Sequence, residues 1–269
     1  YTTLFRSVVA TNDLPRSADA ADAAAADTTV QFDVRYTFGF DPLQQYVVET
    51  QPGQLQVLNV AWSADASAPG WFDLYQDDPL NGDDPLHWSS ELHNWNSRCA
   101  SCHVTEFEKN YEPASGVYAS TQAVDNVGCE ACHGPGSLHA AAPGVAMPVA
   151  TAFDAQWAFS DAPIAARVAG SDDASARQVE ACGACHSRRA QLAPHAAGVA
   201  YLDAFEPAWL TEGLYHADGQ ILDEVFVYGS FLQSRMHAAG VTCTDCHEPH
   251  SGALRANGDA LCATCHRAD

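Results

Sequence analysis

Hydrophobic and polar residues alternate in one region of the chain, between Thr28 and Tyr75. The clearest example is Thr28–Phe38, which is rich in β-branched and aromatic residues. The alternation recurs in three shorter segments, at 46–50, 55–62 and 71–75. Such alternation is typical of strands, and Pro52-Gly53 favours a hairpin turn between two of them. The pattern predicts a small antiparallel β-sheet over residues 28–76.

The rest of the chain shows little periodicity. Residues 1–27 read as a loop or a short helix of low complexity, and residues 141–180 are rich in Ala and Pro. Helical patterns are short and cover residues 174–181 and 229–240, whereas residues 225–228 resemble a strand. Outside the sheet, we therefore expect a mostly irregular chain with short α-helices.

A segment rich in Pro, Asp and Gly, residues 77–85, separates the alternating β-rich pattern from the irregular pattern that follows. It predicts a boundary between a β-rich module, residues 1–86, and a second region, residues 87–269.

One motif recurs through the second region: two cysteines separated by two residues and followed at once by histidine. In chain order, motifs 1 to 5 are Cys99-Ala-Ser-Cys102-His103, Cys129-Glu-Ala-Cys132-His133, Cys182-Gly-Ala-Cys185-His186, Cys243-Thr-Asp-Cys246-His247 and Cys262-Ala-Thr-Cys265-His266. They include all ten cysteines of the chain. CxxCH is the attachment signature of c-type haem.

Zinc sites, redox disulfides and structural bridges also use paired cysteines. Zinc ribbons do not require histidine after every second cysteine, and a disulfide framework would not space every cysteine alike. The repetition therefore predicts five covalent haems, each held by two thioethers and by the motif histidine as proximal iron ligand. A porphyrin is a large apolar disc, so we expect a fold organised by haem, and we expect the region 1–86 to carry none.

Candidate distal ligands come from the other histidines. Five of the twelve histidines lie in the motifs, which leaves seven, whereas the chain has only two methionines. Bis-histidine ligation is therefore the economical expectation, and without methionine ligands the reduction potentials should be low. The preferred candidates are His139 and His250, which follow a motif through a turn, then His216, His237 and His87. His93 competes with His87 for one role, and His195, in a loop that reads as exposed, is not expected to bind iron.

The charge is strongly acidic, with 34 Asp and Glu against 12 Lys and Arg. Nucleic acid is not an expected partner, because phosphate binding needs a basic face. Acidic pairs such as Asp77-Asp78, Asp83-Asp84 and Asp172-Asp173 leave calcium open as a further cofactor, although paired Asp in a loop is usually only solvated. An acidic surface also suits solubility or high salt.

The sequence contains no apolar run long enough to span a membrane. Haem is attached to cysteines outside the cytoplasm, so we expect a periplasmic or extracellular protein. We expect its export signal to have been removed or to lie outside these residues.

Several segments resemble the multihaem c-type cytochromes that are often described together with TPR repeats. They are Tyr36–Tyr46, Asp84–Trp88, Val127–His139, Leu210–Gln220, Tyr228–Met236 and Thr242–Ser251. The resemblance implies electron transfer outside the cytoplasm, with distal ligands at His87, His139, His216 and His250. Such proteins usually carry another CxxCH upstream, and this chain starts at Tyr1 without one, so one distal ligand can be missing from the chain itself.

Three functions compete at this point. The first is an electron conduit that exchanges electrons with other redox proteins or with copies of itself, including a head-to-tail polymeric filament. The second is an oxidoreductase of a small nitrogen or sulfur compound at one open haem, where Arg188-Arg189 would bind an anion or, as the blander alternative, haem propionates. The third is a structural or sensory module that docks through its β-rich segment.

Overall fold

The computed structural model of the protein describes residues 6–10, 29–39, 41–77, 80–149 and 155–267. The chain divides into two compact units, residues 1–127 (unit 1) and 128–269 (unit 2). The predicted boundary between residues 86 and 87 lies inside unit 1. That boundary separates an expected haem-free part from an expected haem-binding part, and it stays a prediction.

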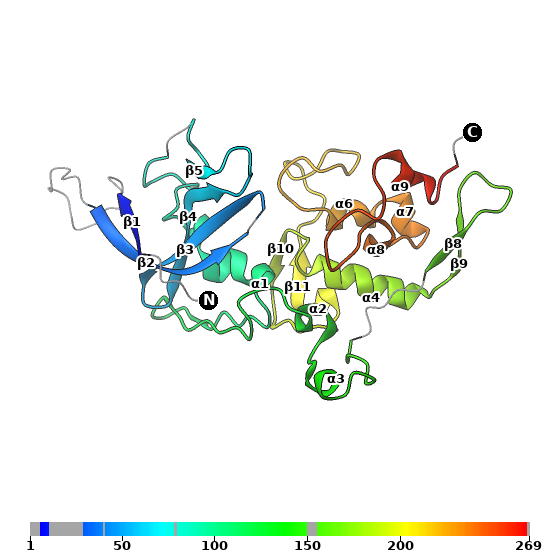
Figure 1. Cartoon of the computed structure of the whole chain (residues 1–269), viewed down its shortest axis with the longest axis horizontal. Coiled ribbons are helices and arrows are strands. Elements are labelled where there is room, and N and C mark those ends of the chain that lie inside the picture. The colour runs from blue at the N-terminus through cyan, green and yellow to red at the C-terminus, as the bar shows by residue number, and fades with distance from the viewer. Residues whose placement is uncertain (1–5, 11–28, 40, 78–79, 150–154, 268–269) are drawn as a thin grey trace. The chain divides into compact units, whose positions relative to one another are not determined.

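Unit 1 is built on an antiparallel sheet in which neighbouring strands are consecutive in the chain (Figure 1). The strands after the first are β2 (Thr29–Phe38), β3 (Leu43–Gln51), β4 (Gln54–Ser63) and β5 (Gly70–Asp73). They confirm the predicted sheet. Gly53 at the hairpin turn has φ +79°, and a Cβ there would lie 2.1 Å from the carbonyl oxygen of Tyr118, so the turn needs glycine.

The first strand, β1 (Arg6–Ala10), corrects the prediction of a loop or helix over residues 1–27. It pairs antiparallel with β2, with Arg6 opposite Asp33 and Ala10 opposite Thr29. A five-residue strand is too short to show an alternation of its own, and its partner strand supplies the hydrogen bonds. The low-complexity tract at 18–27 lies outside the described residues.

Side chains pack on both faces of this sheet. Successive residues of a strand point to opposite faces. Accordingly, Val47 belongs to a buried cluster with Trp95, while the adjacent Val48 belongs to another with Trp88. Four successive residues of β4, 56–59, are therefore buried, which a strand with one solvated face would not show.

Polar side chains of β4 and of the next segment hold the two together. Gln56 donates to the carbonyls of Trp88 and Ser90, each at 2.9 Å, and Asn96 accepts from the amide of Leu55 at 2.9 Å. These contacts place η1 (Glu91–His93), η2 (Trp95–Cys99) and α1 (Ala100–His103) beside the sheet. The unit ends with a small hairpin of β6 (Tyr111–Glu112) and β7 (Val117–Tyr118).

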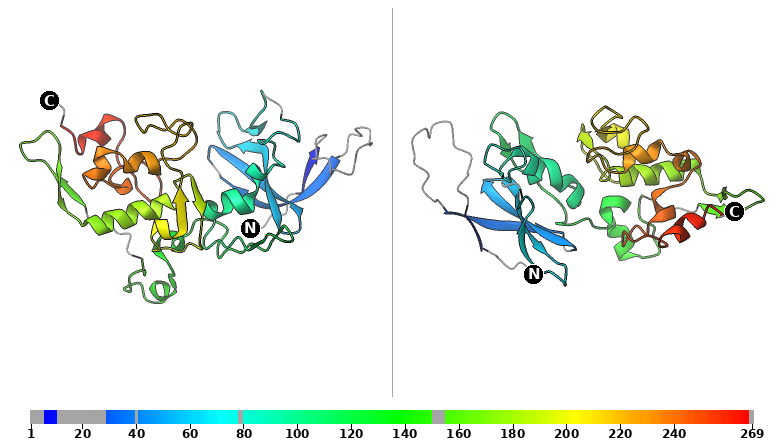
Figure 2. Two further views of the ribbon diagram at one scale, coloured as in Figure 1. Left: turned by 180° about the vertical axis from the view of Figure 1, so that it is seen from behind. Right: turned by 90° about the horizontal axis from the view of Figure 1, so that it is seen from above.

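Unit 2 consists mainly of loops and short helices, as predicted. Its helices are α2 (Glu130–His133), α3 (Ser137–Ala141), α4 (Asp172–Gly183), α5 (Tyr201–Ala204), α6 (Tyr228–Leu232), α7 (Arg235–Ala238), α8 (Cys243–Cys246) and α9 (Asp259–Ala263). A small hairpin pairs β8 (Gln156–Ala158) with β9 (Ala166–Ala169), and a two-stranded sheet pairs β10 (Arg189–Gln191) with β11 (Phe205–Pro207), with α5 between its strands in the chain. Figure 2 shows the β8–β9 hairpin, in light green, beside the start of α4.

Helix α4 confirms the helix predicted at 174–181. Its N-terminus is capped by Ser171, whose hydroxyl accepts from the amide of Ala174, and Asp172 and Asp173 lie in its first turn, where the helix dipole favours negative charge. With 12 residues it is the longest helix in the described part of the chain. No helix there is long and apolar enough to cross a membrane.

Two predictions in the region 225–240 were wrong in detail. Residues 225–228 do not form a strand, because Phe226 has φ +59° and Tyr228 begins α6. The single helix expected at 229–240 is interrupted, and Ser234 caps the separate helix α7 by accepting from the amide of His237 at 3.0 Å.

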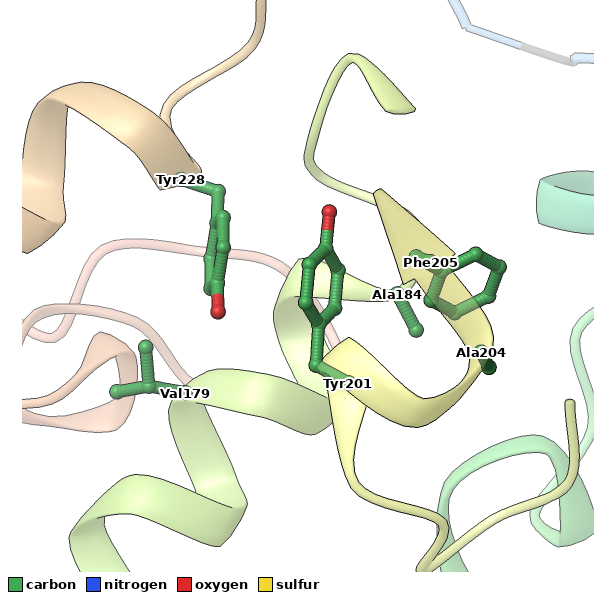
Figure 3. Close-up of a cluster of buried hydrophobic side chains, with 6 residues drawn as sticks. All are labelled: Val179, Ala184, Tyr201, Ala204, Phe205 and Tyr228. Carbon is green, nitrogen blue, oxygen red and sulfur yellow. The ribbon is translucent and has the colours of Figure 1, made fainter. Parts of the chain in front are cut away.

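The core of unit 2 is aromatic (Figure 3). It consists of Val179, Ala184, Tyr201, Ala204, Phe205 and Tyr228. The rings of Tyr201 and Tyr228 face each other with centroids 4.7 Å apart, and the Tyr201 hydroxyl lies 2.7 Å from the Ser187 hydroxyl. This core joins α4 to α5 and α6, next to motif 3.

Candidate haem-binding sites

Each CxxCH motif includes a helical turn. In motifs 2 to 5 the histidine amide donates to the carbonyl of the first cysteine at 2.8–2.9 Å, and motif 1 ends in α1. Residues three apart in a helical turn lie on the same side, so the two thiols of a motif face the same way. The x-x spacing between the cysteines therefore has a local structural cause.

The residues present fit covalently bound haem. All ten cysteines lie within the described residues, and none of them is paired in a disulfide there. A same-side thiol pair suits the two vinyl groups of one porphyrin. Haem, when bound at such a turn, supplies an iron that takes up and releases one electron.

Backbone carbonyls orient two of the motif histidines. The ring Nδ1–H of His133 donates to the carbonyl of Val149 at 3.4 Å, and that of His247 donates to the carbonyl of Gly252 at 3.3 Å. A carbonyl only accepts, so these contacts place the proton on Nδ1 and leave the Nε2 lone pair for a metal. His103, His186, His247 and His266 are exposed, whereas His133 is half-buried.

Aromatic rings of unit 1 lie close to the histidine of motif 1. Phe38 and Trp95 lie 5.3 and 5.8 Å from the ring of His103, measured between centroids. Burial raises the pKa of the nearby Cys99 thiol to about 11. Trp95 is a residue at this site that was not among the predicted site residues. Its spacing, four residues before Cys99 in a helical run, was the available signal.

Helix α4, which ends in motif 3, contacts motif 4 directly. Gln178 of α4 donates to the Thr244 hydroxyl at 2.8 Å and accepts from the Thr244 amide at 3.3 Å. The neighbouring Cys243 thiol is the main cause that raises the pKa of Cys182, and the neighbouring Cys182 thiol is the main cause that lowers the pKa of Cys243. The first cysteines of two different motifs are therefore neighbours, which local sequence spacing does not reveal.

The β8–β9 hairpin connects motifs 4 and 5 through strand β8 and through the loop between its two strands. Trp157 donates through Nε1 to the carboxylate of Asp245, inside motif 4, at 2.8 Å. The amide of Ala165 donates to the carbonyl of Cys265 at 2.8 Å, and Ile164 forms a β-bridge with His266. This hairpin, absent from the prediction, helps to position both motifs.

Among the distal-ligand candidates, His250 lies beside a motif histidine. The rings of His250 and His133 have centroids 6.3 Å apart and an interplanar angle of 20°. The structure thus brings together residues of motif 2 and of the turn after motif 4.

The other candidates have varied surroundings, and their iron ligation stays a prediction. His87 is buried, with Nδ1 2.8 Å from the Ser89 hydroxyl. His139 is exposed and donates to the carbonyl of Val145 at 2.7 Å. His216 is exposed, and His237 is half-buried with the ring of Phe231 5.4 Å away.

The remaining two histidines are half-buried. Burial is the main cause that lowers the pKa of His93. His195 lies in a loop whose neighbouring residues are mostly exposed, as expected, but its ring packs on Phe205 with centroids 4.9 Å apart. Burial, followed by the charge of Arg189, lowers the pKa of His195.

The arginine pair and one of the acidic pairs form contacts within the protein, whereas Asp78 of another pair lies outside the described residues. Arg188 pairs with Asp223 at 2.8 Å, and Arg189 lies 3.8 Å above the ring of Phe205. Asp172 forms an ion pair with Arg167. Among the described residues, no group of three or more His, Cys, Asp or Glu side chains converges to hold a metal ion, and calcium stays a prediction.

Comparison with known proteins gives two matches. Residues 75–134, which include motifs 1 and 2, match the family described as cytochrome c554 and c-prime. Residues 237–269, which include motifs 4 and 5, match the doubled CXXCH motif. Nothing matches the chain among curated proteins or among solved structures.

The two matched segments lie at opposite ends of the motif series, and their descriptions name a cytochrome c and the doubled CXXCH motif. Proteins of this kind are matured outside the cytoplasm. Together with the helical CxxCH turns, the matches show that the chain is a multihaem c-type cytochrome, which implies electron transfer.

Proposed function

We propose that the protein carries five covalent haems, one at each motif, and passes electrons along them in the periplasm or outside the cell. The observation that supports this best is the contact between Gln178 of α4, the helix that ends in motif 3, and Thr244 of motif 4. A helix that delivers one attachment turn and binds another keeps the two haems close together, and fixing such spacing is the contribution of a protein to electron transfer between cofactors.

The proposed iron ligands are mainly histidine pairs. The motif histidines are proximal, and His87, His139, His216, His237 and His250 are distal. Met147 and Met236 are the only methionines, so most irons are expected to bind two imidazoles and to have low reduction potentials.

The proposed partners are other redox proteins or further copies of this chain. A head-to-tail contact between copies that does not close into a ring would give a filament with a continuous series of haems. In such a filament a neighbouring subunit can donate a distal histidine.

Electron paramagnetic resonance of the oxidised, haem-loaded protein at high and low concentration tests these proposals. Six-coordinate bis-histidine irons are low-spin, so five low-spin signals at both concentrations are expected of a conduit. A high-spin signal that grows on dilution would mean that a neighbouring subunit supplies a ligand. One iron that is high-spin at every concentration would overturn the conduit and favour catalysis at an open haem.

A further inference from the structure

We propose that His133 and His250 bind the same iron from opposite sides, so that the haem of motif 2 takes its distal ligand from the turn after motif 4. This pairing rests on the proposed function, since it requires a haem at motif 2. It assigns one ligand pair among the candidate histidines.

The separation of the two rings suits one metal between them. An imidazole nitrogen lies about 2 Å from a metal it binds, and the ring centre lies about 1 Å beyond the nitrogen, so two trans imidazoles have centres about 6 Å apart. The centroids of His133 and His250 are 6.3 Å apart, with ring planes inclined by 20°.

Both rings are oriented through Nδ1, which leaves Nε2 for iron. His133 donates to the carbonyl of Val149 at 3.4 Å. His250 Nδ1 lies 3.2 Å from the carboxylate of Glu248, which can only accept. Partners of this kind on the far nitrogen fix the tautomer and direction of a metal-binding histidine.

The turn that carries His250 is itself well defined. The carboxylate of Glu248 accepts from the amide of Ser251 at 2.7 Å, and the amide of Glu248 donates to the carbonyl of Ala253 at 2.9 Å. His250 is therefore presented by a closed turn.

The alternative is that His250 binds the iron of its own motif, whose proximal ligand is His247. Three residues extend over at most about 10 Å, and within that length the chain would have to pass around the edge of the porphyrin. The His247 ring is also directed by its bond to the carbonyl of Gly252. The alternative is thus less consistent with the geometry.

The pairing has a consequence for electron flow. His247 and His250, three residues apart, would hold the irons of motifs 4 and 2, so these two haems become neighbours. The order of haems in space then differs from the order of motifs in the chain.

The test uses His250→Ala in the full haem-loaded protein and in a chain that also carries Cys129→Ser and Cys132→Ser, which removes the haem of motif 2. In the full protein, one additional high-spin iron is expected by paramagnetic resonance. In the chain without that haem, His250→Ala should add none. An additional high-spin iron there, or none in the full protein, would overturn the pairing. His195→Ala is the matched control, since His195 packs on Phe205.

Mass spectrometry distinguishes a failure of this pairing from a failure of the proposed function. If Cys129 and Cys132 carry no haem, the proposed loading with five haems is wrong. If they carry haem and His250→Ala adds no high-spin iron, only the pairing is wrong. If the double-serine chain does not fold, Cys129→Ser alone leaves the haem attached by one thioether and shifts its absorption band. In the double variant Cys129→Ser, His250→Met, methionine ligation should raise the reduction potential of that haem. A spectroelectrochemical titration should therefore show the raised potential at the shifted absorption band. A rise on any other band would contradict the pairing.

Discussion

Gly183 lies at a close approach between motif 3 and the aromatic core. A Cβ at this position would lie 2.5 Å from the Cε2 atom of Tyr228. The Tyr228 ring packs against Tyr201, so it has little room to move away. Gly183 is the first of the two variable residues in this CxxCH motif. Packing against Tyr228, and not haem chemistry, therefore restricts which residue can stand there.

Gly183→Ala is expected to lower the free energy of unfolding by about 1–3 kcal/mol, the usual cost of forcing extra volume into a packed site. The measurement is the denaturant midpoint of the haem-loaded protein. Gly144→Ala is the control, because no atom lies within 4 Å of a Cβ built there. Equal midpoints for the two variants would contradict the packing argument.

The tyrosines of the same core predict a dependence of stability on alkaline pH. Burial raises the pKa of Tyr228 to about 12, and burial also raises the pKa of Tyr201. An unfolded tyrosine titrates near pH 10, so between about pH 10 and 12 the unfolded chain loses a proton that the folded protein keeps. The stability contributed by these phenols is therefore complete below pH 10 and is lost as the pH rises toward 12.

Tyr228→Phe should make this loss less steep, without abolishing it, because Tyr201 remains. The free energy of unfolding, measured at intervals between about pH 9 and 12, checks the slope. An unchanged slope in Tyr228→Phe would show that other groups dominate the alkaline transition.

At the scale of elements, the contact between α4 and α8 holds motifs 3 and 4 together. Gln178 is 3 % exposed and forms two hydrogen bonds with Thr244. Gln178→Ala would leave the Thr244 amide and hydroxyl without these partners. The expected loss of stability is about 1–3 kcal/mol.

Arg177→Ala is the matched control for Gln178→Ala, since Arg177 is the adjacent, exposed residue of the same helix. Thermal or denaturant unfolding of the haem-loaded variants gives the comparison. If both substitutions had the same small effect, the α4–α8 contact would not stabilise unit 2.

The sheet of unit 1 shows where local pattern fails at this scale. Alternation correctly predicted strands β2 to β5, because a strand buries at least one face. It did not reveal that Trp88 and Trp95 pack on the two faces, since they follow the sheet in the chain and reach it only after folding. Strand β1, the β8–β9 hairpin and the left-handed Phe226 were missed for the same reason: their partners or their backbone conformation depend on distant residues.

At the scale of the whole molecule, the net charge of −22 predicts how small redox mediators react with the protein. A cationic mediator should reduce the haems more slowly as ionic strength rises, because salt screens its attraction to the acidic surface. An anionic mediator should react faster in the same series.

Stopped-flow reduction by a cationic, an anionic and a neutral mediator measures these rates. The neutral mediator is the control and should show little dependence on salt. The same salt dependence for all three would mean that the surface charge does not control encounter with the haems.

The sequence by itself determined the cofactor chemistry, the β-sheet and the short helices. These depend on neighbours along the chain: CxxCH occupies one helical turn, and alternation reflects the two faces of a strand. Only the tertiary structure decided that Gln178 bonds to Thr244, that Trp95 faces His103, and that His250 lies beside His133. The physical reason is that these pairs form by packing between separate segments, and the spacing of residues along a chain does not specify which segments meet.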